Sequence, residues 1–358
     1  MKSQYRAAVI GGGVVGTSIL YHLAKMGWED VVLFEKLELT SGSTWHAAGL
    51  LPLFNMSYSV GKIHKYSVDL YQQLEEETGQ PVGFHKNGNL RLARTEERMD
   101  EYRRYSGTAS TIGVPYELIG PSEIKNLWPF AEVNDLVGAL YHPDDGHVAP
   151  VDVTMALAKG ARMNGAEIFT QTEVTGIRQK PNDEWVVTTS EGDVTCEVVV
   201  SCTGNYARQT GSMVGLELPV VPVEHQYIVT GAMPELAEYN RSGKPELAVL
   251  RESDASYYMR QEADGLILGP YEKGAPCWAL DGVPEGFGQE LLASDVERLE
   301  PHVIAAGKRV PLFESAGMKE CINGPIAYTP DGNPIVGPAP GLRNFYLSEG
   351  HSFGITAA

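Results

Sequence analysis

The start of the chain changes from an apolar run to a glycine cluster and then to a helical apolar pattern. The run Ala7–Ile10 predicts a buried strand, and the glycines that follow it predict a turn. Apolar residues then recur at helical spacing until Gly27, and Asp30–Lys36 contains a second apolar run. This order predicts a strand, a helix and a second strand of a parallel sheet.

Two amphipathic helical patterns follow, over residues 62–79 and 95–113, and Thr95 is placed to cap the second. The sequence GNLRLA between them predicts a strand. A further helix is expected over 150–165. Four closely spaced strand patterns then run from 166 to 204, as in a β-meander that returns to a parallel sheet.

The pattern changes between about Leu216 and Ser315. Alternating runs such as VEHQYIVT, ASYYMRQ and GLILGPY predict an antiparallel sheet. We therefore expect an α/β chain, α+β overall, with a Rossmann-like cofactor domain that carries a β-meander and is interleaved with an antiparallel-sheet substrate domain. The expected cofactor domain comprises residues 1–82, 145–215 and 320–358, and the substrate domain comprises 83–144 and 216–319.

The last residues give a strand pattern at NFYLSE, a turn at Gly350 and the first residues of a helix near Gly354. A helix of four residues is too short to nucleate. The pattern therefore predicts that the chain is a fragment of a longer product.

Charge and composition restrict the partners. The formal net charge is −18, which argues against non-specific binding to nucleic acid or to an anionic membrane. No apolar run is long enough to span a bilayer, and three glycines interrupt what would be the apolar part of a signal peptide. The four cysteines form no C-x-x-C pair. These features predict a cytoplasmic protein with reduced thiols and a small-molecule ligand.

The glycine cluster fits a dinucleotide fingerprint. Gly11, Gly13 and Gly16 have the G-x-G-x-x-G spacing between a strand and a helix, and Glu35 ends the second strand about 20 residues later. An acid at this position accepts hydrogen bonds from the ribose hydroxyls of an adenosine. The small residues of LTSGSTWHAAGLLP follow directly, where NAD dehydrogenases continue with further βα units. This layout favours FAD over NAD.

The motifs GGGVVG, GSTWHAAGL, DGHVAP, VEHQY, SYYMRQE, NGPIAYTPDG and GHSFGI resemble, along essentially the whole chain, the FAD-dependent amine oxidoreductases of the D-amino-acid oxidase superfamily. Within that superfamily the chain is most similar to the dimethylglycine and sarcosine dehydrogenases. The motifs GSTWHAAGL and NGPIAYTPDG are the most specific.

The resemblance implies that a ring nitrogen of His46 is bonded to the 8α-methyl group of the flavin. It implies backbone contacts from the glycine-rich turn to the phosphates, and contacts from the second strand to the adenosine. The residues implied in FAD binding are Gly11, Gly13, Val14, Val15, Gly16, Glu35, Lys36, Gly42, Ser43, Thr44, His46, Ala47, Gly49, Leu50, Val174, Tyr206, Gly350, His351, Ser352, Gly354 and Ile355.

The implied reaction is the oxidative N-demethylation of an N-methylated glycine by hydride transfer to the flavin. The reacting amine must be neutral, so the site needs a base or must lower the amine pKa. The family places a His and a Tyr over the flavin, here His225 and Tyr258, and strand alternation turns Tyr257 away. Either Arg260 or Arg91 could bind the substrate carboxylate.

The chain departs from the monomeric sarcosine oxidases. It has no basic residue near Gly354 and no cysteine attachment motif. This difference favours a dehydrogenase, whose relatives pass electrons to an electron-transfer flavoprotein and carry a tetrahydrofolate-binding module after the FAD module. Other FAD chemistry remains open, such as that of a glycine oxidase, a glycerol-3-phosphate dehydrogenase or a tRNA-modifying oxidase, and so does a non-catalytic flavin-binding fragment.

No metal site is expected. The remaining histidines are predicted to be structural or solvated; those considered are His64, His85, His142, His147 and His302.

Overall fold

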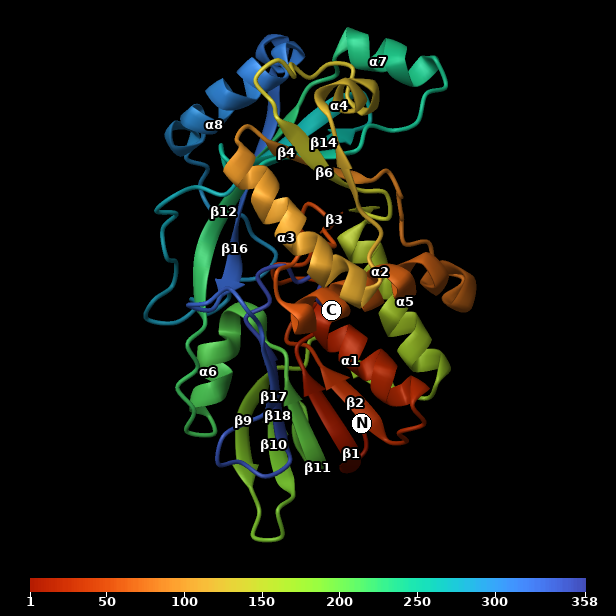
Figure 1. Ribbon diagram of the computed structural model, residues 1–358. Coiled ribbons are helices and arrows are strands. Elements are labelled where there is room, and N and C mark those ends of the chain that lie inside the picture. The colour runs from red at the N-terminus through yellow and green to blue at the C-terminus, as the bar shows by residue number, and fades with distance from the viewer.

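A computed structural model describes residues 1–358 and contains two large sheets, one above the other in Figure 1. The lower sheet has the strand order β17-β18-β11-β1-β2-β8, with the β9–β10 hairpin attached to β11. Its strands are β1 (Gln4–Ile10), β2 (Val31–Phe34), β8 (Glu167–Phe169), β9 (Val174–Gln179), β10 (Trp185–Thr189), β11 (Gly192–Ser201), β17 (Ile335–Pro338) and β18 (Phe345–Glu349).

The β1-α1-β2 unit is confirmed. Both neighbours of β1, β2 and β11, are parallel to it, and β2 is buried throughout, as expected for a strand covered on both faces. Helices α1 (Val14–Lys25) and α5 (Pro150–Met163) cover one face of this sheet, and α2 (Tyr58–Thr78) packs against α5. Of the four strands predicted at meander spacing, β9, β10 and β11 form the meander, whereas β8 pairs with β2 in the parallel sheet. The meander packs a second core on the opposite face.

The upper sheet has the order β16-β12-β15-β14-β13-β4-β6-β5. It is antiparallel except between β13 and β4, which are parallel. Its strands are β4 (Asn89–Ala93), β5 (Glu117–Ile119), β6 (Gly138–His142), β12 (Val221–Thr230), β13 (Val249–Glu252), β14 (Tyr257–Glu262), β15 (Gly265–Pro270) and β16 (Met318–Tyr328).

One face of the upper sheet packs a core with three helices: α4 (Pro121–Leu127), α7 (Pro234–Arg241) and α8 (Val296–Arg309). Another helix, α3 (Glu96–Ile112), begins as predicted after Thr95, whose side chain accepts a hydrogen bond from the Arg98 N–H at 3.3 Å. The remaining elements are short: the two-stranded ribbon of β3 (Leu50–Leu51) and β7 (Gly146–His147), helix α6 (Ala207–Ser212), and the 3₁₀ turns Gly204–Tyr206 and Pro311–Ser315.

Two expectations are corrected. The boundary predicted at residue 320 cuts into β16, which pairs with β12 from Thr230↔Met318 to Val221↔Tyr328 and so belongs to the upper sheet. No helix forms near Gly354. The segment is a turn, which Tyr71 holds through a hydrogen bond from its hydroxyl to the Ile355 carbonyl oxygen at 2.8 Å.

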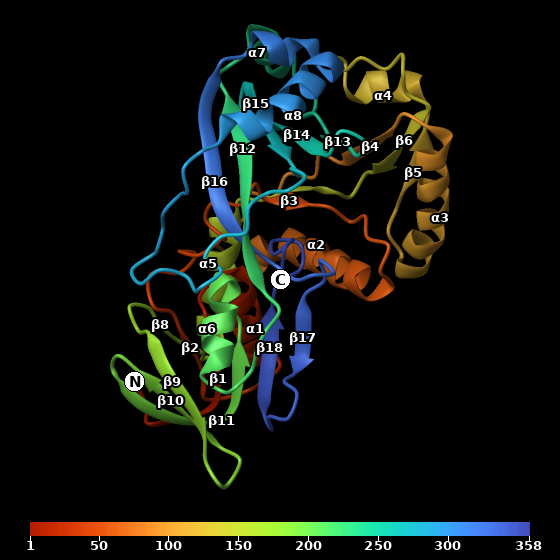
Figure 2. The same cartoon turned by 90° about the vertical axis from the view of Figure 1, so that its left-hand side faces the viewer.

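The two sheets meet where strands from both parts of the chain end. In Figures 1 and 2, the long strands β12 and β16 run from the upper sheet down to the carboxyl end of the lower one, and the C-terminus lies between the sheets. No helix combines the length and the apolar character needed to cross a membrane.

Candidate cofactor and substrate site

A cavity of about 790 Å³ lies between the two sheets and has the size of a typical ligand site. Every residue predicted to bind FAD lines it except Gly16, and both predicted catalytic residues line it. The lining set comprises Gly11, Gly13, Val14, Val15, Glu35, Lys36, Gly42, Ser43, Thr44, His46, Ala47, Gly49, Leu50, Val174, Tyr206, His225, Tyr258, Gly350, His351, Ser352, Gly354 and Ile355.

Gly16 has a packing role instead. A Cβ atom on Gly16 would lie 1.9 Å from the Gly11 carbonyl oxygen, so only glycine lets α1 approach the end of β1 this closely. Gly11 has φ +107°, and a Cβ there would lie 2.3 Å from the Cys202 carbonyl oxygen. The first and third glycines of the motif therefore fix the turn and the helix beneath the cavity.

We expect Gly16→Ala to destabilise the protein by at least about 1–3 kcal/mol, the usual cost of overpacking, because the contact is with rigid backbone. Urea unfolding of the FAD-free chain is the measurement. Gly42→Ala is the matched control, because a Cβ there would meet nothing within 4 Å. Equal midpoints for the two variants would contradict the packing role.

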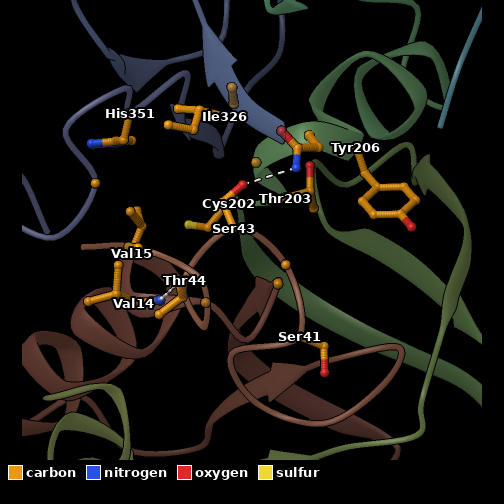
Figure 3. Close-up of a pocket in the computed structure, with 18 of the residues that line it drawn as sticks. Val14, Val15, Ser41, Ser43, Thr44, Cys202, Thr203, Tyr206, Ile326 and His351 are labelled. Atoms are coloured by element: carbon orange, nitrogen blue, oxygen red, sulfur yellow. Dashed lines mark hydrogen bonds between the residues drawn. The ribbon is translucent and has the colours of Figure 1, made fainter. Parts of the chain in front are cut away.

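The N-terminus of α1 is suited to bind a diphosphate. Its N-cap, Gly13, provides no side-chain cap, and the first turn contains no acidic residue. The Val14 N–H donates to Thr44 Oγ1 at 3.2 Å, and both residues border the cavity in Figure 3. A helix N-terminus presents its remaining backbone N–H groups and a positive dipole to an anion.

The adenosine end contains Glu35 and Lys36. The Glu35 carboxylate accepts hydrogen bonds from the Gly12 N–H at 2.6 Å and the Leu37 N–H at 2.9 Å, which fix its position. Burial raises the pKa of Glu35. The Lys36 ammonium lies 4.6 Å from the centre of the Tyr206 ring, and the Tyr206 hydroxyl donates to the Phe287 carbonyl oxygen at 2.7 Å. Together these residues form a polar wall where the second strand ends.

The segment Gly42–Leu50 runs along the cavity and is fastened to both sheets. Ser43 donates to the Pro325 carbonyl oxygen at 2.6 Å and accepts from the Asn205 amide at 3.0 Å. The His46 side chain is buried against Gly324 of β16. A Cβ atom on Gly324 would lie 2.4 Å from His46 Cε1, so this glycine leaves space for the imidazole.

Burial lowers the pKa of His46 to about 4. The imidazole is therefore neutral near pH 7, with a lone pair on one ring nitrogen. His225 lies beside it, because His225 pairs with Gly324 across β12 and β16. Burial, with smaller contributions from His46 and Arg251, lowers the pKa of His225 to about 4 as well.

The face of the upper sheet that borders the cavity is aromatic. Tyr258 lines the cavity, whereas Tyr257 packs in the core on the opposite face of the sheet, as strand alternation predicted. The His225 ring stacks on Tyr271, with 5.3 Å between ring centres. A Cβ atom on Gly269 would lie 2.0 Å from Tyr258 Cζ, so Gly269 makes room for that ring. Burial raises the pKa of Tyr258, which keeps its hydroxyl protonated.

The arginine in the cavity is Arg251, and neither Arg260 nor Arg91 lines it. The Arg260 side chain bends away, donating to the Ala48 carbonyl oxygen at 3.1 Å and pairing with Glu262 at 2.6 Å. Arg251 is 6% exposed, and its Nε and Nη2 have no hydrogen-bond partner. Arg251 lines the cavity, and a guanidinium in a cavity wall can bind a carboxylate.

Sequence reasoning missed Arg251, Tyr271 and Glu349. The buried Glu349 carboxylate accepts four hydrogen bonds, from Ser201 Oγ and from Thr203 and Gly204, at 2.7–2.9 Å, and so holds the end of β11 beside β18. The segment 283–288 also lines the cavity, next to Tyr206. An acid directly before the predicted Gly350 turn and a tyrosine two residues after Gly269 were the available signals.

The fold and this cavity define a dinucleotide-binding protein of the flavin type, in which the cavity lies between two sheets. The family model "FAD dependent oxidoreductase" (DAO) matches residues 6–358, and the chain belongs to this family. The solved structure of L-proline dehydrogenase from P. horikoshii is similar, with a TM-score of 0.85 and 27% sequence identity. The alignment covers 100% of this chain and 91% of the chain of that structure.

Among curated proteins, mitochondrial dimethylglycine dehydrogenase from mouse (Mus musculus) is 45% identical over 100% of the chain. Human (Homo sapiens) mitochondrial sarcosine dehydrogenase is 37% identical over 98% of it. The chain spans 41% and 38% of the length of these two relatives, so it corresponds to the FAD-dependent part of longer proteins.

Proposed function

We propose that this chain binds FAD and oxidises the C–N bond of an N-methylated glycine, dimethylglycine or sarcosine, in an oxidative N-demethylation. The observation that carries the proposal is that Arg251 and the neutral His225 line the same cavity. A carboxylate and an amine on one small substrate match these two groups. The names of the two similar dehydrogenases, dimethylglycine dehydrogenase and sarcosine dehydrogenase, state substrates of this kind.

The residues present fit FAD. The α1 N-terminus would hold the diphosphate and Glu35 the ribose, and Gly42–Leu50 would run along the cofactor toward the flavin ring. Bound FAD would supply the acceptor for a hydride from the N-methyl carbon. We further propose that a ring nitrogen of His46 is bonded to the 8α-methyl carbon, which its neutral state and its position against Gly324 support.

The protein residues prepare the substrate. Arg251 would bind the carboxylate and so fix the amine near His225, which lines the same cavity. A neutral His225 would accept the ammonium proton, leaving the nitrogen lone pair free to assist C–H cleavage. The protonated Tyr258 would act as a hydrogen-bond donor within this face.

The proposal is tested by mixing the FAD-loaded protein with dimethylglycine, sarcosine or glycine without oxygen and following flavin absorbance. We expect bleaching by an N-methylated glycine, faster than by glycine. Flavin that none of the three bleaches would remove the substrate assignment. Undiminished bleaching in Tyr258→Phe and His225→Ala variants would remove the roles proposed for these two residues.

We expect His225→Ala to slow flavin reduction at pH 7 by about 10²-fold, the lower end of the usual general-base contribution, because a group with a pKa near 4 is a weak base. The loss should shrink near pH 10, where much of an alkylamine is already neutral. Stopped-flow reduction at both pH values is the measurement, with His22→Ala as a control outside the cavity. A loss that is equal at pH 7 and pH 10 would contradict a role in deprotonation.

Electron-transfer flavoprotein as the acceptor, tetrahydrofolate as a partner of a following module, and a cytoplasmic location remain proposals. The names of both dehydrogenase relatives include "mitochondrial", which does not support the cytoplasmic location. Fractionation of source cells would test the location, and reoxidation of reduced protein by oxygen or by an electron-transfer flavoprotein would test the acceptor.

A further inference from the structure

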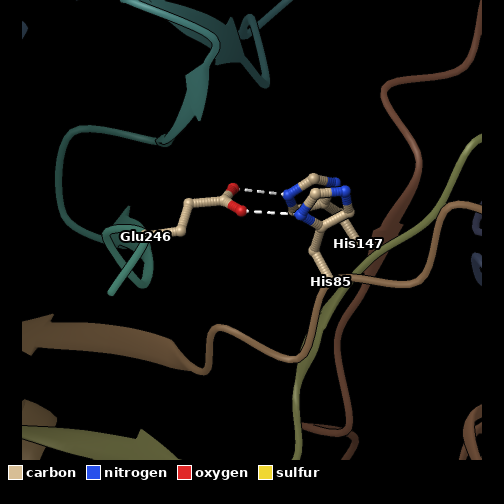
Figure 4. A group of neighbouring side chains, drawn as sticks. All are labelled: His85, His147 and Glu246. Carbon is tan, nitrogen blue, oxygen red and sulfur yellow. Dashed lines mark hydrogen bonds and ion pairs between the residues drawn. The ribbon is translucent and has the colours of Figure 1, made fainter. Parts of the chain in front are cut away.

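A second cluster of polar side chains lies outside the flavin cavity. His85 Nδ1 is 2.8 Å from one oxygen of Glu246, and His147 Nε2 is 2.7 Å from the other. Figure 4 shows both rings directed at the same carboxylate. The three ligating atoms lie within 4.8 Å of one another. The sequence suggested no partner for either histidine, because Glu246 comes from a distant part of the chain.

The backbone fixes the two histidines relative to each other. His85 and His147 form an antiparallel bridge in which each N–H donates to the other's carbonyl oxygen, at 2.8 and 3.0 Å. Side chains of such a pair project from the same face. The rings stack with 4.6 Å between their centres and an angle of 11°. Two imidazole nitrogens therefore converge without any rearrangement of the chain.

The surroundings favour a cation. The cluster borders a cavity of about 310 Å³ that is also lined by Glu262, Asp264 and Arg260. Three carboxylates thus face one guanidinium, and Arg260 is itself paired with Glu262. A negative site that contains two imidazoles and a carboxylate matches the ligand preference of zinc, which takes nitrogen and carboxylate oxygen at about 2.0–2.2 Å.

We propose that His85, His147 and Glu246 bind one divalent transition metal ion of the zinc type. The ligands are His85 Nδ1, His147 Nε2 and a Glu246 oxygen, and water or a second carboxylate completes a tetrahedron.

This ion would connect two parts of the flavin cavity. His147 lies opposite Leu50, the last residue of the cavity-lining segment Gly42–Leu50, in the β3–β7 ribbon. Glu246 lies shortly before β13, which carries Arg251. The proposal does not depend on the proposed reaction, because the site contains no residue of the flavin cavity.

The test is titration of the chelator-treated full chain with Zn²⁺ by calorimetry, with metal analysis after gel filtration. A Cys277→Ser background removes the exposed thiol, which could bind zinc by itself. We expect one ion per chain. His85→Ala and Glu246→Gln should each weaken binding by at least about 100-fold, because loss of a direct ligand exceeds the 10–100-fold cost of losing an outer-shell partner. His22→Ala is the matched control and should bind like the parent.

The outcomes are distinguishable. The His85 side chain is 54% exposed, so His85→Ala should fold, and its circular dichroism and metal-free melting should match those of the parent. Absence of saturable binding, or binding unchanged in His85→Ala and Glu246→Gln, would overturn the metal site and leave a hydrogen-bonded cluster. Because the readout uses neither flavin nor turnover, failure here and failure of the proposed function are separate results.

Discussion

Replacing Arg251 with Met is expected to abolish tight binding of a carboxylate substrate while leaving the FAD site intact. Arg251 is the arginine that lines the cavity, so in the proposed complex its guanidinium would make the charged contact to the substrate. Truncating one partner of a buried hydrogen-bonded charge pair costs about 2–5 kcal/mol. This corresponds to a rise in apparent Kd or KM of roughly 30-fold to several-thousand-fold.

Anaerobic titration of flavin absorbance measures this effect. Arg91→Met is the matched control, because Arg91 pairs with Arg251 across β4 and β13 but does not line the cavity. A tertiary amine without a carboxylate provides a second control, since its binding should be insensitive to residue 251. Equal losses in the two arginine variants, or for both kinds of amine, would show that Arg251 acts on the fold and not on the substrate carboxylate.

The second large effect is expected at His46. If this residue carries the flavin, acid-denatured protein should remain yellow, and His46→Ala should release all of its flavin into the supernatant. Gly324→Ala should also reduce formation of this bond, because the added Cβ would lie 2.4 Å from His46 Cε1 and displace the imidazole. Overpacking of about 1–3 kcal/mol would reduce the population of the correctly placed ring roughly 5- to 150-fold.

The measurement is flavin fluorescence of the polypeptide after acid precipitation and gel electrophoresis. Gly317→Ala is the matched control, since it directly precedes β16 and a Cβ there would meet nothing within 4 Å. Flavin that leaves the parent chain in acid would refute the covalent bond. It would leave the FAD cavity and the proposed reaction untouched.

Local patterns predicted the parts of the fold that depend on neighbours in sequence. The β1-α1-β2 unit, the cap at Thr95 and the meander arise from short-range periodicity and capping. The parallel pairing of β13 with β4 was not predictable in this way, because the two strands lie far apart in the sequence, with strands of both sheets between them. Strand pairing of this kind depends on tertiary packing.

The arginines show the same limit at the level of side chains. Alternation correctly put Tyr258 on the cavity side of β14, but it does not determine where a long side chain ends. Arg260 shares that face, and its guanidinium reaches the Ala48 carbonyl oxygen instead of the cavity. Arg251 lies in a strand that is buried throughout, where no alternation of polar and apolar residues indicates its direction.

The continuous pairing of β12 with β16 has a consequence for substrate choice. The same ladder contains His225 and Gly324, against which His46 rests, and Arg251 belongs to the same sheet. The separation between the backbone of Arg251 and that of Gly324, against which His46 packs, is therefore set by backbone hydrogen bonds within one sheet. The sheet would therefore select substrates by length. One added methylene between the nitrogen and the carboxylate of the substrate should cost about 1–3 kcal/mol in selectivity.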